Sequence, residues 1–148
     1  MEFDKTIRVL LADDHAMVRR GLRRILEKVP HIVVIGEAGT GAAAIQLVHE
    51  LKPDVLLLDM EMPDMKGYTV TRQLRDCNVP VSILVVSACD EEYFMEELLR
   101  DGADEFLSKG VSPEAIREAV YRVFAKHSQV SVVAGLFIFL VSPVTILF

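Results

Sequence analysis

One short apolar run does most to limit what this chain can fold into. Residues 54–58, Asp-Val-Leu-Leu-Leu, follow Pro53 and are too apolar to keep one face in water. A strand of this kind is buried on both faces, which is typical of parallel sheets covered by helices. Four other short apolar runs, also predicted as strands, lie at 7–12, 32–35, 81–86 and 105–107. The sequence therefore predicts a sheet of five strands.

Longer amphipathic stretches separate these runs. We predict helices at about 17–26, 40–51, 68–76 and 90–102, and a last helix that begins with Ser112 as its cap and Pro113 in its first turn. Residues 36–39, Gly-Glu-Ala-Gly, are predicted to form a turn. Because strands alternate with helices and crossovers are right-handed, we expect an α/β fold with a doubly wound, five-stranded parallel sheet.

Apolar residues at helical spacing predict which face of a helix is buried. For the first helix they are Met17, Val18, Gly21, Leu22, Ile25 and Leu26. For the last helix they are Ile116, Ala119, Val120 and Val123. Arg19, Arg20, Arg23 and Arg24 fall on other faces of the first helix, and we predict that they line its solvated side.

Polar side chains follow the predicted strands directly. Asp13 and Asp14 come after the first strand, Asp59 after the third, Ser87 after the fourth and Lys109 shortly after the fifth. The carboxyl ends of parallel strands meet at one edge of the sheet, where open α/β sheets place their functional sites. We therefore expect these side chains to converge.

Three carboxylates at one edge would repel one another unless a cation lies among them. Oxygen ligands favour a hard ion that keeps several waters, which describes Mg²⁺ better than zinc. Such an ion would offset the repulsion between a carboxylate and a phosphoryl donor. Lys109 would neutralise charge on the transferred group, and the Ser87 hydroxyl would bond to a phosphate oxygen. The pattern predicts phosphoryl transfer to Asp59.

Taken singly, most of these residues have simpler explanations. Asp13 and Asp14 could be a helix cap and its neighbour, Lys109 a solvated loop lysine, and Ser87 a turn residue. Asp59 is harder to explain in this way, because an ionised group at the end of a buried strand needs partners. Their joint placement at strand ends favours the functional interpretation.

Four segments of the chain resemble the receiver domains of two-component response regulators. They are LLADDHAMVRRGL, VLLLDMEMPDMKGYT, ILVVSACDEEYFMEELLRDGADEFLSKG and SPEAIREAV. The resemblance extends over about residues 5–126, and it is nearest to the subfamily that usually carries a helix-turn-helix output domain. It implies a flavodoxin-like, three-layer receiver domain, which we assign to residues 1–127.

By this resemblance, Asp59 is the phosphoacceptor and its carboxylate also binds Mg²⁺. Asp14 is the more direct metal ligand of the acidic pair, and Asp13 supports it. The main-chain carbonyl of Glu61 is the expected third protein ligand. The Glu61 side chain lies two residues after the acceptor, where it can reach an attacking water, so we expect it to change the lifetime of the phosphorylated state.

The same resemblance gives roles on the phosphoryl side. Ser87 and Lys109 contact the phosphoryl group, and Phe106 takes the position of the aromatic switch residue. Phe106 stands where many relatives have Tyr, so it can swing inward but cannot make a hydroxyl bond. Gly110 follows the lysine where many relatives have Pro.

The implied partner is a sensor histidine kinase, and phosphorylation would switch protein association, for example into a homodimer. The chain would act as an enzyme only on itself. One alternative is a Mg²⁺-dependent phosphatase or phosphotransferase that uses an aspartyl-phosphate, although such enzymes typically have a second Asp where this chain has Glu61. The other alternative is an interaction module that is not phosphorylated.

Charge and cysteine content bear on partners and location. With 16 basic and 22 acidic residues, the net charge of -6 argues against direct nucleic-acid binding. A helix-turn-helix output domain would need about 60 residues with a basic recognition helix in addition to the receiver domain, and we predict no such domain in this chain. Cys77 and Cys89 form no paired motif, which favours reduced thiols and a cytoplasmic protein.

Residues 128–148 contain no Asp, Glu, Lys or Arg. Within them, 130–148 is long and apolar enough for a transmembrane helix, and Arg122 and Lys126 precede it. Three explanations remain open. The tail could tether the domain to the inner face of the membrane, which we slightly favour, pack on a neighbouring protomer, or have no evolved role.

Overall fold

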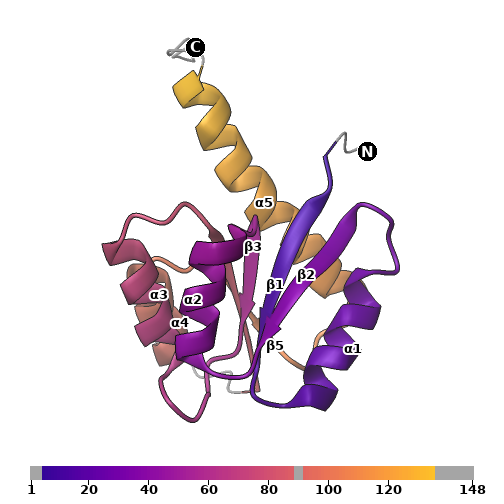
Figure 1. Cartoon of the computed structure of the whole chain (residues 1–148), viewed down its shortest axis with the longest axis vertical. Helices are drawn as coiled ribbons and strands as arrows, with labels where there is room; N and C mark the ends of the chain where they lie inside the picture. The colour runs from indigo at the N-terminus through magenta and orange to yellow at the C-terminus, as the bar shows by residue number, and fades with distance from the viewer. Residues whose placement is uncertain (1–4, 89–91, 136–148) are drawn as a thin grey trace.

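The structure is a computed structural model that describes residues 5–88 and 92–135 of the chain (Figure 1). Strands and helices alternate along these residues, as the sequence predicts. In chain order they are β1 (Ile7–Ala12), α1 (Ala16–Leu26), β2 (Ile32–Ala38), α2 (Gly41–Leu51), β3 (Val55–Leu58), α3 (Gly67–Asp76), β4 (Ser82–Ser87), α4 (Glu92–Arg100), β5 (Glu105–Ser108) and α5 (Pro113–Gly135).

The strands form one parallel sheet in the order β2-β1-β3-β4-β5, which confirms the doubly wound fold. The chain moves outward from β1 to the edge strand β2 and then returns past β1 to β3. Strand order therefore reverses between β1 and β3, and ligands bind at such a point in open sheets. Helices α1 and α5 pack together on one face, while α2, α3 and α4 cover the other (Figure 1).

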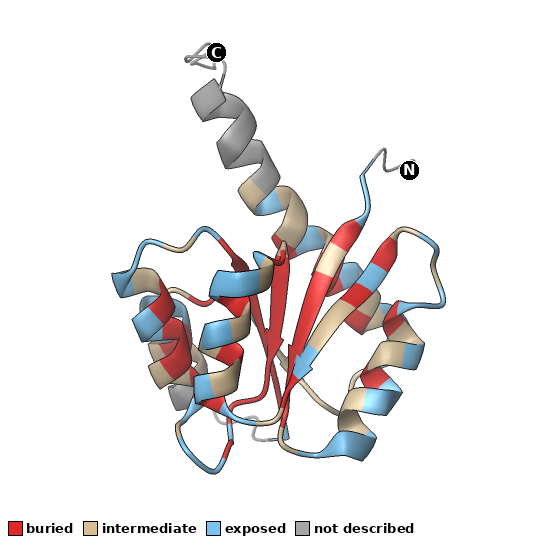
Figure 2. Ribbon diagram, viewed as in Figure 1, coloured by how far each residue is buried: buried red, intermediate tan, exposed pale blue. Residues whose placement is uncertain are grey.

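Strand β3 is buried along its whole length, as its sequence predicts (Figure 2). Its side chains alternate between two apolar layers. Leu56 and Leu58 pack under α2 and α3, and Val55 and Leu57 pack under α1 and α5. Because both layers close on this central strand, the residue that follows it is held at a fixed and largely dry position.

The buried stripe of α5 is confirmed, since Ile116, Ala119, Val120 and Val123 are all buried. The predictions for Met17 and Gly21 are wrong, because the exposed fraction of Met17 is 81% and Gly21 is exposed as well. The inward face of α1 is centred on Leu22 and Leu26, with Val18 and Ile25 partly buried beside them. Met17 precedes Val18 by one residue, and one residue turns a helix by about 100°, so Met17 points to solvent.

The largest differences from the predicted bounds are at the end of strand β2 and at the end of the receiver domain, which the sequence predicts at residue 127. Strand β2 continues to Ala38 instead of ending at Ile35, because an irregularity after Val9 restores its pairing with β1 as far as Ala12–Ala38. The predicted turn at 36–39 is therefore mostly strand. Helix α5 runs on to Gly135, past the change in composition at residue 128, and projects beyond the sheet in Figure 1.

The predicted cap Asp90 and residues 136–148 of the tail lie outside the described residues. Among the residues that the structure does describe, no helix is both long and apolar enough to span a bilayer. The membrane anchor therefore stays a prediction.

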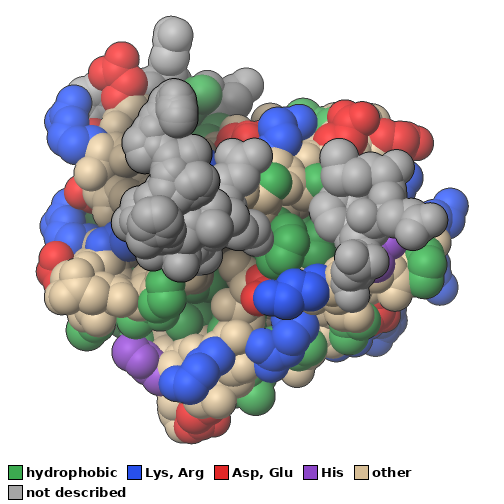
Figure 3. Space-filling view, turned by 90° about the horizontal axis from the view of Figure 1, so that it is seen from above, with side chains coloured by type: hydrophobic (Ala, Val, Ile, Leu, Met, Phe, Trp, Pro, Cys, Tyr) green, Lys and Arg blue, Asp and Glu red, His purple; other side chains and the backbone are tan. Residues whose placement is uncertain are grey.

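Charged side chains are paired at the edge of the sheet where the strands begin. Asp104 Oδ2 accepts hydrogen bonds from Ile83 N at 2.8 Å and from an Arg75 Nη at 3.1 Å. Its other oxygen lies 2.8 Å from His127 Nε2 and 3.7 Å from Lys126 Nζ. Figure 3 looks onto this end of the molecule, where both basic and acidic side chains are present. These contacts join β4, β5, α3 and α5.

Gly21 offers a test of the fold. It is an exposed helical glycine, and a Cβ built on it would meet nothing within 4 Å. Gly21→Ala should therefore raise the free energy of unfolding by about 0.5–1 kcal/mol, or the melting temperature by about 2–4 °C.

Gly67→Ala is the contrasting variant. Its Cβ would lie 3.0 Å from both the Asp59 carbonyl oxygen and Met60 Cα, which are backbone atoms at the end of a buried strand. We expect a loss of about 1–3 kcal/mol, measured by thermal denaturation. An unchanged or higher melting temperature for Gly67→Ala would contradict the close packing of α3 on β3.

Candidate functional site

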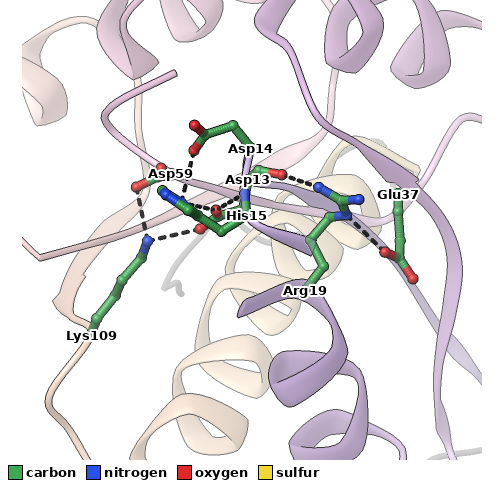
Figure 4. A network of polar contacts seen from close by, with 7 residues as sticks. All are labelled: Asp13, Asp14, His15, Arg19, Glu37, Asp59 and Lys109. Carbon is green, nitrogen blue, oxygen red and sulfur yellow. Dashed lines mark hydrogen bonds and ion pairs between the residues drawn. The ribbon is translucent and has the colours of Figure 1, made fainter. Parts of the chain in front are cut away.

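Asp13, Asp59 and Lys109 meet at the carboxyl edge of the sheet (Figure 4). Asp13 follows β1, Asp59 follows β3, and Lys109 follows β5. Lys109 Nζ lies 2.8 Å from Asp13 Oδ2 and 3.3 Å from Asp59 Oδ1. The structure thus brings these residues together from strands that are far apart in the sequence.

The main chain fixes these positions. Asp59 N donates to the Ala12 carbonyl at 2.8 Å, and Lys109 N donates to the Ser87 carbonyl at 2.8 Å. Each bond continues the parallel ladder just past the end of a strand. The main-chain pairing of the sheet therefore fixes the positions of these acidic and basic residues independently of their side-chain contacts.

Burial and charge both act on this cluster. The exposed fraction of the side chain is 2% for Asp13 and 5% for Asp59. Burial raises the pKa of Asp59, and the nearby Asp13 carboxylate raises it further, while Lys109 offsets part of this effect. Burial disfavours the charged form of Lys109, but its bond to Asp13 and the charge of Asp59 outweigh that effect and raise its pKa. One ammonium group thus faces two carboxylates.

Asp14 adds a third carboxylate beside this cluster. Its Oδ1 atom is buried and accepts no hydrogen bond within the described part of the chain. The His15 ring is largely exposed, and its Nδ1 lies 3.0 Å from Asp14 Oδ1 and 3.3 Å from Asp13 Oδ1. A divalent cation would give the buried Asp14 oxygen a partner.

Ligand atoms of Asp13, Asp14 and His15 lie within 4.8 Å of one another, a grouping that could hold a metal ion. Asp59, which the sequence predicts as a ligand, is held instead in the ion pair with Lys109. The carboxylate oxygens of this group suit a hard cation such as Mg²⁺, whereas the imidazole of His15 is a ligand that softer metals prefer.

The remaining predicted residues lie on β4, on β5 and in the loop after β3. Ser87 is the buried last residue of β4. Phe106 lies on β5, half-buried against the apolar layer under α2, α3 and α4. Glu61 is exposed and forms an ion pair with Lys66, with which it also makes an antiparallel bridge. The bridge folds the loop after β3 back on itself.

Asp64 holds this loop, and the sequence analysis missed it. Its two carboxylate oxygens accept hydrogen bonds from Gly41 N at 2.8 Å and Ala42 N at 2.9 Å, at the start of α2. These bonds lower the pKa of Asp64. An acidic residue in a loop gives no sequence signal that it caps a helix elsewhere in the chain.

The prediction that all four arginines of α1 face solvent is only partly right. Arg20 and Arg24 are exposed, whereas Arg19 and Arg23 are partly buried and bind the carboxylate of Glu37 on β2. Arg19 also donates to the main-chain carbonyl of Asp13 (Figure 4). Sequence reasoning missed Arg19 and Glu37, because Glu37 was assigned to a turn.

Comparison with known proteins shows which family this chain resembles. Residues 9–121 match the response regulator receiver domain. The chain belongs to this family. The resemblance seen in the sequence is thus confirmed, and so is the receiver fold.

Similar proteins include whole response regulators and isolated receiver domains. The response regulator GacA of Pseudomonas aeruginosa is 37% identical over 125 residues, which are 84% of this chain and 58% of GacA. The nitrate/nitrite response regulator NarL of Escherichia coli is 37% identical over 117 residues, 79% of this chain and 54% of NarL. This receiver domain therefore spans a little over half the length of these relatives.

Among solved structures, the signal receiver domain of the putative response regulator NarL from Mycobacterium tuberculosis superposes with a TM-score of 0.79 at 37% identity. That match covers 82% of this chain and 98% of the other. The isolated REC domain of RcsB from Salmonella enterica, solved in the presence of phosphomimetic BeF3-, superposes with a TM-score of 0.74 at 25% identity, over 79% of this chain and 87% of the other.

The charge excess at the site gives a prediction about stability. Asp59→Asn should raise the melting temperature at pH 7 in metal-free buffer. Because the pKa of Asp59 in the folded chain is raised above its ordinary 3.8, the ionised carboxylate costs stability. This cost is absent below pH 3.8, grows as the pH rises to the raised pKa, and is complete above it.

Asp64→Asn serves as the control of opposite sign. The pKa of Asp64 is lowered by the Ala42 and Gly41 N–H groups, so loss of its charge should lower the melting temperature at pH 7. Thermal scans between pH 3 and 8 check both effects. An Asp59→Asn variant no more stable than the wild type at pH 7 would show that the carboxylates do not repel.

Proposed function

We propose that this receiver domain takes a phosphoryl group onto Asp59 from a sensor histidine kinase or a small phosphodonor, in a Mg²⁺-dependent reaction. The observation that carries the proposal is the convergence of Asp13, Asp59 and Lys109, with the Lys109 ammonium 2.8 Å and 3.3 Å from the two carboxylates. In a balanced ion pair, each carboxylate has a basic partner. Here the excess of carboxylate leaves charge for a cation to balance.

The carboxylates of Asp13, Asp14 and Asp59 and the main-chain carbonyl of Glu61 would hold Mg²⁺. Bound there, Mg²⁺ would neutralise charge on the incoming phosphoryl group and reduce its repulsion by the acidic residues. The protein's own part is to keep these oxygens in place, through the ladder bonds at the strand ends and through the Asp64 contacts that anchor the loop carrying Glu61.

In the proposed reaction, a carboxylate oxygen of Asp59 attacks the phosphorus atom of the donor. A bond from oxygen to phosphorus forms, the bond from phosphorus to the donor breaks, and the donor leaves with the electron pair. Lys109 would need to move little to contact the negatively charged phosphoryl group on Asp59, because its ammonium group already touches the Asp59 carboxylate. Its raised pKa keeps it charged, as a group that binds phosphoryl oxygens must be.

Phosphorylation would then shift the population between two packings of the domain. The Ser87 hydroxyl would bond to a phosphoryl oxygen, and Phe106 would move into the space behind it. Ser87 and Phe106 lie on the neighbouring strands β4 and β5, so a movement of the Ser87 side chain would alter the packing around Phe106. The surface of α4, β5 and α5, or that of α1 and α5, would change its association with a partner, including a second copy of the chain.

The domain would act catalytically only on its own phosphorylation and dephosphorylation. We also propose a cytoplasmic location, which the lack of a paired cysteine motif in the sequence and a kinase partner favour. The proposal concerns the receiver domain only. It does not extend to activities that the longer relatives have outside this domain.

Incubation with acetyl phosphate and Mg²⁺ tests the proposed reaction. Mass spectrometry should show the gain of one phosphoryl group by the wild type, and none by Asp59→Ala or after chelation of Mg²⁺. Asp76→Ala is a matched control, because Asp76 is an exposed carboxylate at the last residue of α3. This control should be phosphorylated like the wild type.

The same experiment separates the alternatives. Steady hydrolysis of an unrelated phosphate ester would favour a phosphatase. No mass gain by the wild type would favour an interaction module that is not phosphorylated. Size-exclusion chromatography with and without beryllofluoride then measures whether association changes.

Glu61 gives a further prediction. Its side chain is exposed and held only by the ion pair with Lys66 among the contacts described, and such surface pairs are weak. The side chain is therefore free to reach a water near the acyl phosphate. Glu61→Ala should change the rate at which phosphorylated protein loses phosphate, measured after removal of the donor. A rate equal to that of the wild type would contradict this role.

A further inference from the structure

We propose that Arg19 is a positioning residue of the phosphorylation site, locked in place by Glu37. It would hold the main chain of the acidic pair so that the Asp14 carboxylate faces the Mg²⁺ position. The inference rests on the proposed function. It assigns a task to two residues that do not themselves touch the reacting groups.

Both main-chain polar groups of Asp13 are tied to the side of the site formed by β2. Its N–H donates to the carbonyl of Ala38, the last residue of β2, at 3.0 Å. Its carbonyl accepts a hydrogen bond from Arg19, and Arg19 in turn binds Glu37 on the same strand (Figure 4). The backbone of Asp13 is therefore clamped at both ends, while its side chain points to Lys109.

The clamp acts on Asp14 through one peptide bond. The carbonyl of Asp13 and the N–H of Asp14 lie in a single rigid plane. Fixing this carbonyl therefore fixes the direction in which the chain enters Asp14. The Asp14 carboxylate has little else to hold it among the described residues, because its buried Oδ1 accepts no hydrogen bond and its one close neighbour, His15 Nδ1 at 3.0 Å, belongs to a largely exposed ring. The backbone of Asp14 is therefore the main constraint on where this carboxylate lies.

Glu37 fixes the guanidinium of Arg19. Arg19 Nε donates to Glu37 Oε1 at 2.8 Å, and Arg23 donates to Oε2 of the same carboxylate at 3.0 Å through Nε and at 2.9 Å through an Nη. The hydrogen bonds from Arg19 and Arg23 lower the pKa of Glu37 and keep it ionised. A planar guanidinium can bind Glu37 with one nitrogen and Asp13 with another, which a lysine ammonium cannot match.

The charge of Arg19 is not its contribution to the site. Glu37 and Glu27 together balance the charges of Arg19 and Arg23, so Arg19 adds a directed hydrogen bond without opposing a metal cation. An arginine that served only to neutralise the acidic pair would be expected to touch the carboxylates of Asp13 or Asp14. Arg19 is instead bonded to the main-chain oxygen of Asp13.

Arg23 provides a matched control on the same helix. It lies one turn after Arg19 and shares the Glu37 carboxylate, but its other hydrogen bond goes to the Val34 carbonyl at 3.4 Å. Arg19→Ala and Arg23→Ala therefore remove the same charge and the same partner. Among the described contacts, only Arg19→Ala also releases the acidic loop.

The experiment is a calorimetric titration of the full chain with MgCl₂, together with thermal denaturation without metal. We expect both variants to lose some stability. Arg19→Ala should raise the Kd for Mg²⁺ by about tenfold or more, the range found when a group that orients a metal ligand is removed. Arg23→Ala should change the Kd less than about twofold. At saturating Mg²⁺, Arg19→Ala should still be phosphorylated on Asp59 by acetyl phosphate.

Equal Kd values for the two variants, or an unchanged Kd for Arg19→Ala, would overturn the role of Arg19 and leave the proposed function intact. A wild type that neither binds Mg²⁺ nor gains a phosphoryl group would overturn the proposed function as well. If Arg19→Ala does not fold, the comparison of Arg19→Lys with Arg23→Lys decides. These variants keep the charge, and only the first should weaken Mg²⁺ binding.

Discussion

The site depends on one electrostatic constraint, which is that Lys109 cannot balance the carboxylates around it. Asp13 and Asp59 follow neighbouring strands of a rigid sheet, so they cannot move apart to relieve their repulsion. Lys109 touches both, and Asp14 adds a third acid that it does not neutralise. Burial raises the pKa of Asp59, and the uncompensated charge of Asp13 raises it further. A site of this kind favours any ligand that brings positive charge, and under the proposed function that charge would make it reactive toward phosphoryl donors.

The opposite edge of the sheet shows what a purely structural charge cluster looks like. Asp104 is also nearly buried, with 8% of its side chain exposed, yet its oxygens face Arg75, His127, Lys126 and a main-chain N–H. Basic groups outnumber the single acid there, and they join α3, β4, β5 and α5. At the carboxyl edge the ratio is reversed. Both oxygens of the buried acid are paired at the first edge, whereas carboxylates outnumber the one ammonium group at the second, as the proposed function requires.

Much of this arrangement could be predicted from the sequence, because buried strands and their ends leave a clear pattern. The run before Asp59 has no wet face, so it had to be a central strand, and parallel pairing then brought Asp13, Asp59 and Lys109 to one edge. The errors in strand β2 and at Met17 both arise where the local pattern of residues does not fix the structure. Strand β2 was cut short because Gly36 and Glu37 resemble a turn, while a local irregularity in its pairing with β1 carries it on to Ala38. Met17 was misplaced because helical spacing leaves the phase of the first turn uncertain.

The residues that sequence reasoning missed share a different property, since they bind main-chain atoms. Arg19 binds the Asp13 carbonyl, and Asp64 binds the N–H groups at the start of α2. Periodicity and motif spacing describe side chains, so they carry no information about which backbone group a distant side chain will meet. Both residues act on the segments that carry predicted Mg²⁺ ligands, one on the acidic pair and one on the loop after β3. A precise site needs rigid main chain around its ligands. Arg19 and Asp64 would supply that rigidity through hydrogen bonds to main-chain groups, without touching the reacting groups themselves.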